Sequence, residues 1–166
     1  NIENAVTKIT EHGKKMHTAR SRNDQVLVDL RLYMRDELLY VSDSIIKLQK
    51  SFVSLSKKEG VFVGYTHTRV AQPITISFWC DSFVKSFDRD IDRLLDCFDR
   101  VNQNPLGACA LSGTSWSIDR VFTAKLLGFD CVQNNELDTI SSRGEAEAEL
   151  IAALVIVMTK LSGLAE

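Results

Sequence analysis

The chain has 166 residues, of which 45% are hydrophobic and 25% are charged, so it can bury a core of ordinary size. Its 20 Lys and Arg residues nearly balance 22 Asp and Glu residues, which excludes the overall basic field that attracts nucleic acid or an anionic membrane. The longest apolar run, at residues 150–158, is too short to span a bilayer, and no signal peptide opens the chain. We therefore expect a soluble protein with no nucleic-acid or membrane partner.

A long amphipathic helix is predicted for residues 24–59. No glycine or proline occurs between Gly13 and Gly60, and apolar residues recur at heptad spacing. The stripe comprises Leu27, Met34, Val41, Leu48 and Leu55, with a second set at Leu38, Ile45 and Phe52. At a rise of roughly 1.5 Å per residue, the two ends of this helix would lie about 50 Å apart.

Further helices are predicted beyond Pro73, which suits a first helical turn. A second long helix runs from about residue 74 to 104 and stops at Pro105, and a short one at 118–127 ends at Gly128. A polar link through Asn134 and Asn135 leads to a third long helix with an apolar stripe. No run alternates with period two, so the fold class is expected to be all-α, a bundle of long helices.

Three helices of this length carry more apolar surface than a small monomer buries, because each is longer than an ordinary small domain is wide. We therefore expect a homo-oligomer that assembles through the long helices. The four cysteines, Cys80, Cys97, Cys109 and Cys131, show no CxxC spacing, which favours reduced thiols in the cytoplasm over a disulfide or a zinc site.

Two polar runs stand at opposite ends of the first long helix. The first, Ser21-Arg22-Asn23-Asp24, lies where an N-cap is expected. Capping alone leaves Arg22 unexplained, because unpaired backbone N–H groups, a guanidinium, a hydroxyl and an amide also make a carboxylate site. Capping and carboxylate binding are equally compatible with the spacing.

The second run, Gly64-Tyr65-Thr66-His67, lies in a link between two long helices. A single histidine is often only a surface residue, but here a threonine hydroxyl stands next to an imidazole that can titrate near neutral pH. The first long helix keeps the two runs too far apart to serve one small-molecule site within a single subunit. A site that uses both must therefore be shared between subunits.

Together these residues resemble the argininosuccinate lyase family of the fumarase and aspartase superfamily, over nearly the whole chain. Residues 15–25, Lys-Met-His-Thr-Ala-Arg-Ser-Arg-Asn-Asp-Gln, look like its first signature region. Gly64-Tyr65-Thr66-His67 with Ala71-Gln72-Pro73 looks like the second. The resemblance implies that residues 1–23 end an N-terminal domain and that residues 24–166 are part of a central helical bundle. The family's third signature, a flexible loop bearing a serine, would come later than Glu166, so the chain looks cut.

The resemblance also implies a reaction: reversible β-elimination of argininosuccinate to arginine and fumarate by a carbon–nitrogen lyase, without metal or organic cofactor. His67 would be the general acid/base residue, and Ser21, Arg22, Asn23 and Thr66 would hold substrate carboxylates. The assembly would be a homotetramer. Without the serine loop, the isolated chain should be inactive.

The sequence also departs from the family pattern. Thr68-Arg69-Val70 replaces Leu-Gln-Arg after the histidine, Ala108-Cys109 replaces a Ser-Gly pair, and the surroundings of Arg143 differ. Two alternatives to an enzyme core therefore remain open: a crystallin-like structural homologue that has lost turnover, or a helical oligomerisation core. Retention of Thr66-His67 and Ser21-Arg22-Asn23 favours the enzyme.

Overall fold

The computed structural model describes residues 2–165, which form two compact units. Unit 1 comprises Asn1–Met34 and Arg100–Ala146, and unit 2 comprises Arg35–Asp99 and Glu147–Glu166. The elements in chain order are α1 (Ile2–Ile9), the 3₁₀ helix η1 (Glu11–Lys15), α2 (Arg22–Leu55), β1 (Val61–Thr66), β2 (Arg69–Thr75), α3 (Ile76–Val101), β3 (Gln103–Asn104), α4 (Arg120–Leu126), β4 (Cys131–Val132), α5 (Glu136–Ser141) and α6 (Glu145–Ala165). The expected boundary after residue 23 falls inside unit 1, and a separate domain there stays a prediction.

Helix α2 confirms the heptad pattern. It has 34 residues, beginning two positions earlier and ending four positions earlier than the pattern predicted. The side chains of its stripe that are buried are Leu27, Met34, Leu38, Ile45 and Phe52. At a rise of 1.5 Å per residue, a helix of this length extends roughly 50 Å from end to end.

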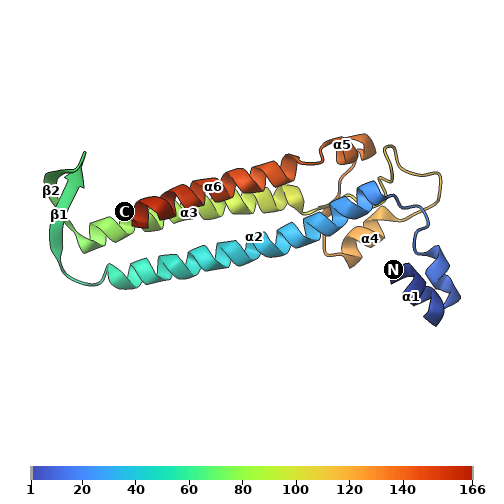
Figure 1. Cartoon of the computed structure of the whole chain (residues 1–166), viewed down its shortest axis with the longest axis horizontal. Helices are drawn as coiled ribbons and strands as arrows, with labels where there is room; N and C mark the ends of the chain where they lie inside the picture. The colour runs from blue at the N-terminus through green and yellow to red at the C-terminus, as the bar shows by residue number, and fades with distance from the viewer. Residues whose placement is uncertain (1, 166) are drawn as a thin grey trace. The chain divides into compact units, whose positions relative to one another are not determined.

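Unit 2 is a bundle in which α3 and α6 run alongside the second part of α2 (Figure 1). Aromatic rings hold α2 to α3: the ring of Phe52 stacks on that of Phe83 with centroids 5.1 Å apart, and it meets the ring of Trp79 in a tilted arrangement at 5.8 Å. Such pairs contribute about 0.5–1.5 kcal/mol beyond their burial. Long helices in a bundle confirm the all-α class.

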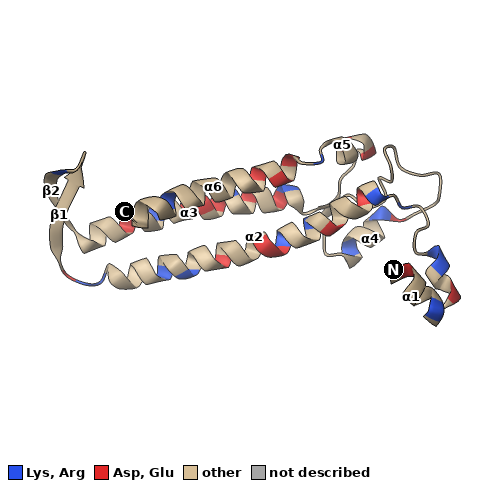
Figure 2. Ribbon diagram, viewed as in Figure 1, with Lys and Arg blue, Asp and Glu red and all other residues tan. Residues whose placement is uncertain are grey.

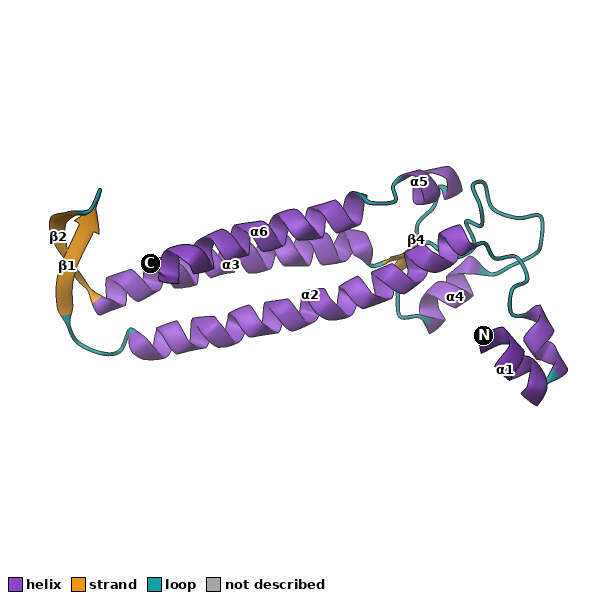
Figure 3. Ribbon diagram, viewed as in Figure 1, coloured by secondary structure: helices purple, strands orange, loops and turns teal. Residues whose placement is uncertain are grey.

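A β-hairpin departs from the expected helical pattern (Figure 3). Strand β1 pairs with β2 in antiparallel register, Val63 opposite Pro73, and α3 begins only at Ile76. The prediction of Pro73 in a first helical turn was therefore wrong. Valine and aromatic residues at 61–65 favour extended backbone, and a two-stranded hairpin has a free edge that tolerates the missing N–H of proline.

Unit 1 is organised around a small core at the start of α2. Val28 packs in a buried cluster with Leu106, Ala124 and Phe129. The short parallel pair β3–β4 and the helix α4, capped by the Asp119 carboxylate at 2.8 Å from the N–H of residue 122, complete this unit. Helix α4 lies within the predicted 118–127 segment.

Helix α5 lies where the sequence predicted only a polar link. Its N-cap is Asn135, whose side-chain oxygen accepts a hydrogen bond of 2.9 Å from the N–H of Asp138. A helix of 6 residues is too short to show a hydrophobic period, so capping rather than periodicity was the signal available.

Two arginines tie the loops of unit 1 together. Arg31 on α2 donates to the carbonyl of Gln103 at 2.6 Å and to the side chain of Gln133 at 2.7 Å. Arg120 donates to the carbonyl of Leu106 at 3.1 Å and forms an ion pair with Glu136 at 2.7 Å. Each guanidinium thus satisfies groups from separate segments, which fixes the loop that follows β3.

Charged residues of both signs are spread along α2 and α3 (Figure 2), mostly on the surface as predicted. The pairs Lys47–Asp43 and Lys85–Asp81 are exposed, so solvent screens them and they contribute little to stability. Asp90 differs, because its side chain is buried and accepts a hydrogen bond from Arg93 at 2.8 Å.

Helix α6 is apolar on more than one side. Ala153 and Val157 are buried, whereas other large apolar side chains are exposed: Ile151, Val155, Ile156 and Met158. By length and composition alone α6 could cross a membrane, although core helices pass the same test. The ammonium of Lys160 lies 5.2 Å from the ring centroid of Phe83 on α3, so we interpret α6 as a bundle helix.

Candidate functional site

The start of α2 is a capping box. Ser21 is the N-cap, and its hydroxyl oxygen accepts a hydrogen bond of 3.2 Å from the N–H of Asn23. In return Asp24 accepts a bond of 2.9 Å from the backbone N–H of Ser21. Capping therefore accounts for Ser21 and Asp24 together. The hydroxyl proton of Ser21 can still be donated to a ligand.

Asp24 also binds a distant loop. Its second carboxylate oxygen accepts hydrogen bonds from the backbone N–H groups of Gly107 at 2.9 Å and Cys109 at 3.0 Å. The side chain is fully buried, with 0% exposure. A buried carboxylate is stable when backbone donors surround it, so Asp24 is an internal anchor and not a surface charge.

Asn23 contacts the same loop. Its side-chain amide donates a hydrogen bond of 3.0 Å to the carbonyl of Ala110. A primary amide has two N–H donors, so one donor remains for a ligand. The loop thereby orients the amide that the sequence analysis assigned to substrate binding.

A pocket of about 530 Å³ opens at this helix start. Among the described residues that line it, two are arginines, Arg20 and Arg22, and none is acidic. Positive side chains beside the N-terminus of a helix of 34 residues favour an anion. The remaining lining residues are His17, Ala19, Ser21, Cys109, Ala110, Gly113, Thr114 and Trp116.

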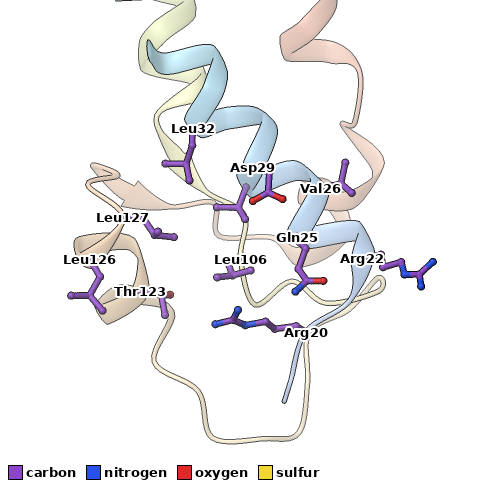
Figure 4. Close-up of a pocket in the computed structure, with 11 residues that line it drawn as sticks. Arg20, Arg22, Gln25, Val26, Asp29, Leu32, Leu106, Thr123, Leu126 and Leu127 are labelled. Carbon is purple, nitrogen blue, oxygen red and sulfur yellow. The ribbon is translucent and has the colours of Figure 1, made fainter. Parts of the chain in front are cut away.

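A second pocket, of about 510 Å³, lies on the side of α2 that faces α4 (Figure 4). Its lining is mainly leucine and valine, including Leu106 and Leu127, and Arg20 and Gln25 also line it. Arg22 points away from the apolar wall in this view. The first pocket, with its hydroxyls and arginines, is the better carboxylate site.

Thr66 and His67 lie in the β1–β2 hairpin of unit 2. Thr66 pairs with Arg69, which leaves His67 and Thr68 as a two-residue turn with φ values of 51° and 61°. Both residues are in the left-handed region, as in a type I′ turn, where asparagine and glycine are usual. A histidine held there is strained and exposed, which is typical of functional positions.

The structure thus brings two of the five predicted site residues, Ser21 and Arg22, to one pocket in unit 1. Asn23 does not line that pocket, but its amide bonds to Ala110 of the pocket wall. Thr66 and His67 belong to the other unit and follow α2 in the chain. Their roles as substrate ligand and acid/base residue stay predictions. The anchoring function of Asp24 and the presence of Trp116 at the pocket were missed, because only the folded loop reveals them.

Burial raises the pKa of the Cys109 thiol, and the charge of Asp24 adds to this rise while Arg120 opposes it. The thiol therefore stays protonated near neutral pH and serves as a hydrogen-bond donor to the carbonyl of Ala19 at 3.2 Å. Among residues 2–165, no group of three or more His, Cys, Asp or Glu side chains could hold a metal ion.

Comparison with known proteins places the whole chain in one family. Residues 1–166 match the model of a family described as Lyase. The chain is 45% identical over 169 aligned positions to the argininosuccinate lyase of Acinetobacter baylyi, covering 100% of this chain and 35% of that protein. It is 49% identical over 146 positions to the argininosuccinate lyase of Alkaliphilus metalliredigens, covering 86% and 32%. The chain thus spans about a third of the length of these relatives.

A solved structure has the same fold. The crystal structure of EDDS lyase in complex with formate superposes with a TM-score of 0.93 at 31% sequence identity, covering 99% of this chain and 33% of that one. The superposition includes nearly all of both units, so the long helices and the hairpin belong to an architecture seen in experiment.

Proposed function

Since the chain belongs to the lyase family, we propose that the protein containing it cleaves argininosuccinate to arginine and fumarate by reversible β-elimination. The observation that carries this proposal is the donor cluster at the start of α2, where Ser21 and Arg22 line a pocket without acidic lining residues among those described and Asn23 bonds to the pocket wall at Ala110. Relatives named argininosuccinate lyase, 42–49% identical to the chain, support this substrate over other fumarate-forming eliminations.

The proposed chemistry needs both negative-charge stabilisation and proton transfer. A base removes the proton next to a carboxylate, negative charge accumulates on that carboxylate, and the guanidinium nitrogen leaves with a proton from an acid. Arg22, Asn23 and Ser21 would stabilise the carboxylate charge. His67 would exchange the proton, and Thr66 beside it would hold a second carboxylate. No step requires a metal or an organic cofactor.

We further propose that each active site is shared between subunits of a homotetramer. Asn23 stands in the first turn of α2 and the hairpin of His67 follows its last residue, and a helix of 34 residues is roughly 50 Å long, whereas substrate contacts require hydrogen-bond distances. Antiparallel packing of α2 against its copy brings the start of one helix to the end of another. The exposed apolar side chains of α6 support such packing, because large apolar patches usually mark interfaces.

Subunit mixing tests the proposal. Full-length His67→Ala and Asn23→Ala variants, each expected to be nearly inactive, are unfolded and refolded together. Random assembly should restore about a quarter of wild-type turnover if each site takes the two residues from two chains. A mixture that stays inactive, although mass measurement confirms mixed oligomers, would place both residues in one chain.

The same assay decides between an enzyme and a structural homologue. Full-length wild type that releases no fumarate from argininosuccinate would favour the crystallin-like alternative. A cytoplasmic location is also proposed, because all four cysteines are free thiols in the structure.

A further inference from the structure

The carboxylate of Asp24 is the point at which the start of α2 and the loop after β3 are joined. One oxygen accepts from the N–H of Ser21, and the other accepts from the N–H groups of Gly107 and Cys109. The loop residues 104–109 are themselves buried. Three backbone donors on one buried carboxylate form an arrangement that neither a hydroxyl nor an amide can reproduce.

The backbone that Asp24 holds is strained. Cys109 has a φ of 57° and Ala19 a φ of 54°, left-handed conformations that cost a residue with a Cβ atom about 1 kcal/mol or more. The two strained residues are also joined, since the Cys109 thiol donates to the Ala19 carbonyl at 3.2 Å. Such conformations persist only where surrounding contacts enforce them. The hydrogen bond from the N–H of Cys109 to Asp24 is one of those contacts.

The strained loop in turn shapes the candidate site. Ala110, directly after Cys109, accepts the hydrogen bond that orients the Asn23 amide. Gly113 and Thr114 farther along the loop line the pocket with Ser21 and Arg22. A shift of this loop would therefore rotate one proposed ligand and displace the pocket wall.

We propose that Asp24 is a positioning residue for this site: its buried carboxylate holds the strained loop at residues 107–113 in place, so that Asn23 and Ser21 present their donors to a substrate carboxylate. Asp24 itself does not contact the ligand. This inference rests on the proposed function, because it assigns the pocket at the start of α2 to a substrate carboxylate.

The test is Asp24→Asn in the full-length enzyme. Asparagine is isosteric and can still accept from Ser21, but its amide group then faces the N–H donors of Gly107 and Cys109 and cannot accept from either. The loop should shift, and misplacement of binding groups by about 1 Å can cost as much as 100-fold. We expect the KM for argininosuccinate and the Kd for fumarate to rise at least about tenfold, with a smaller change in kcat.

Asp119→Ala is the matched control, because the Asp119 carboxylate caps α4 with a comparable hydrogen bond of 2.8 Å, which it accepts from the N–H of Phe122 in its own segment. A purely structural loss reduces the amount of folded enzyme, so it lowers maximal velocity and leaves KM unchanged. Asp119→Ala should show that pattern. Asp24→Asn should instead raise KM at equal concentrations of folded tetramer, measured by titration of active sites.

A rescue variant tests the strain directly. Glycine adopts positive φ without a Cβ penalty, so Cys109→Gly should let the loop keep its conformation with fewer hydrogen bonds. In Asp24→Asn/Cys109→Gly we expect KM to fall about fivefold from the value of the single variant. If Asp24→Asn alone does not fold, KM and fumarate affinity are measured on the double variant instead.

Amide hydrogen exchange separates this inference from the proposed function. In wild type the N–H groups of residues 107 and 109 should be protected, and in Asp24→Asn they should exchange at least tenfold faster. Fast exchange in wild type, or faster exchange in the variant with unchanged KM and unchanged fumarate affinity, would overturn the positioning role. Wild type without lyase activity or fumarate binding would overturn the proposed function, and with it the ligand assigned to this pocket.

Discussion

The side-chain amide of Asn23 donates a hydrogen bond of 3.0 Å to the carbonyl of Ala110, a residue 87 positions later in the chain. This bond fixes which face of the amide is turned to the loop. The second N–H of the same amide is left for a ligand. The contact therefore explains how a residue in the first turn of a helix can be both structural and available for binding.

Asn23→Asp is expected to weaken substrate binding strongly. A carboxylate at this position has no hydrogen-bond donor. Its lone pairs would face those of the Ala110 carbonyl, and its negative charge would repel the substrate carboxylate. Loss of a charge-assisted hydrogen bond together with repulsion costs about 3 kcal/mol or more, roughly a 100-fold rise in KM. Steady-state kinetics on the full-length protein provide the measurement. Unchanged KM would mean that Asn23 does not bind the substrate.

The isolated 166-residue chain is expected to have no lyase activity. The family resemblance assigns half of the acid/base pair to a serine loop that is not in this sequence, and removing one member of such a pair costs several orders of magnitude. Fumarate release can be followed by its ultraviolet absorbance. Production above the buffer rate that disappears in His67→Ala would show that the catalytic groups are misassigned.

Thr68→Gly is expected to stabilise the hairpin. The φ of 61° at Thr68 costs a β-branched residue about 1 kcal/mol, and glycine removes that cost. Scanning calorimetry of the full-length protein should show a higher unfolding temperature. Ser44→Gly on the exposed surface of α2 is the control, because glycine in a helix interior should lower the unfolding temperature. Equal shifts in both variants would contradict a type I′ turn.

Thiol labelling should separate the cysteines by burial. Burial raises the pKa of Cys80, and burial with the charge of Asp24 raises that of Cys109, so less reactive thiolate forms at a given pH. Cys131 is exposed. At pH 8 we expect an alkylating reagent to label Cys131 first, with the labelled peptides identified by mass spectrometry.

The raised pKa values of the two thiols also determine how the stability of the fold changes with pH. A thiol whose pKa is higher in the folded state contributes its stability fully below the pKa of the unfolded thiol, and this contribution is lost as pH rises through the folded value. The folded protein should therefore become less stable at alkaline pH. Cys109→Gly should reduce that dependence, and an unchanged alkaline slope would contradict the assigned shift.

The hairpin shows where sequence reasoning failed. Residues 61–75 carry β-branched and aromatic side chains, but Gly64 and Pro73 interrupt the alternation of apolar and polar residues that is typical of a strand. The antiparallel pairing also depends on two strands meeting across a turn. Helix α5 was missed for a related reason. Its 6 residues are too few to show a periodic pattern, and the helix is stabilised by the Asn135 cap.

What the sequence determined by itself was the long-helix class, the stripe along α2 and the residue types of the two polar runs, because heptad spacing and local motifs depend on neighbours in the chain. Only the tertiary structure decided that Asp24 anchors a loop 83–85 residues away, that Ala110 orients Asn23 and that Cys109 is held at positive φ. Each of these features depends on contacts between distant segments of the chain. The hydrogen bonds between those segments form only when burial of the Val28 cluster brings the segments together.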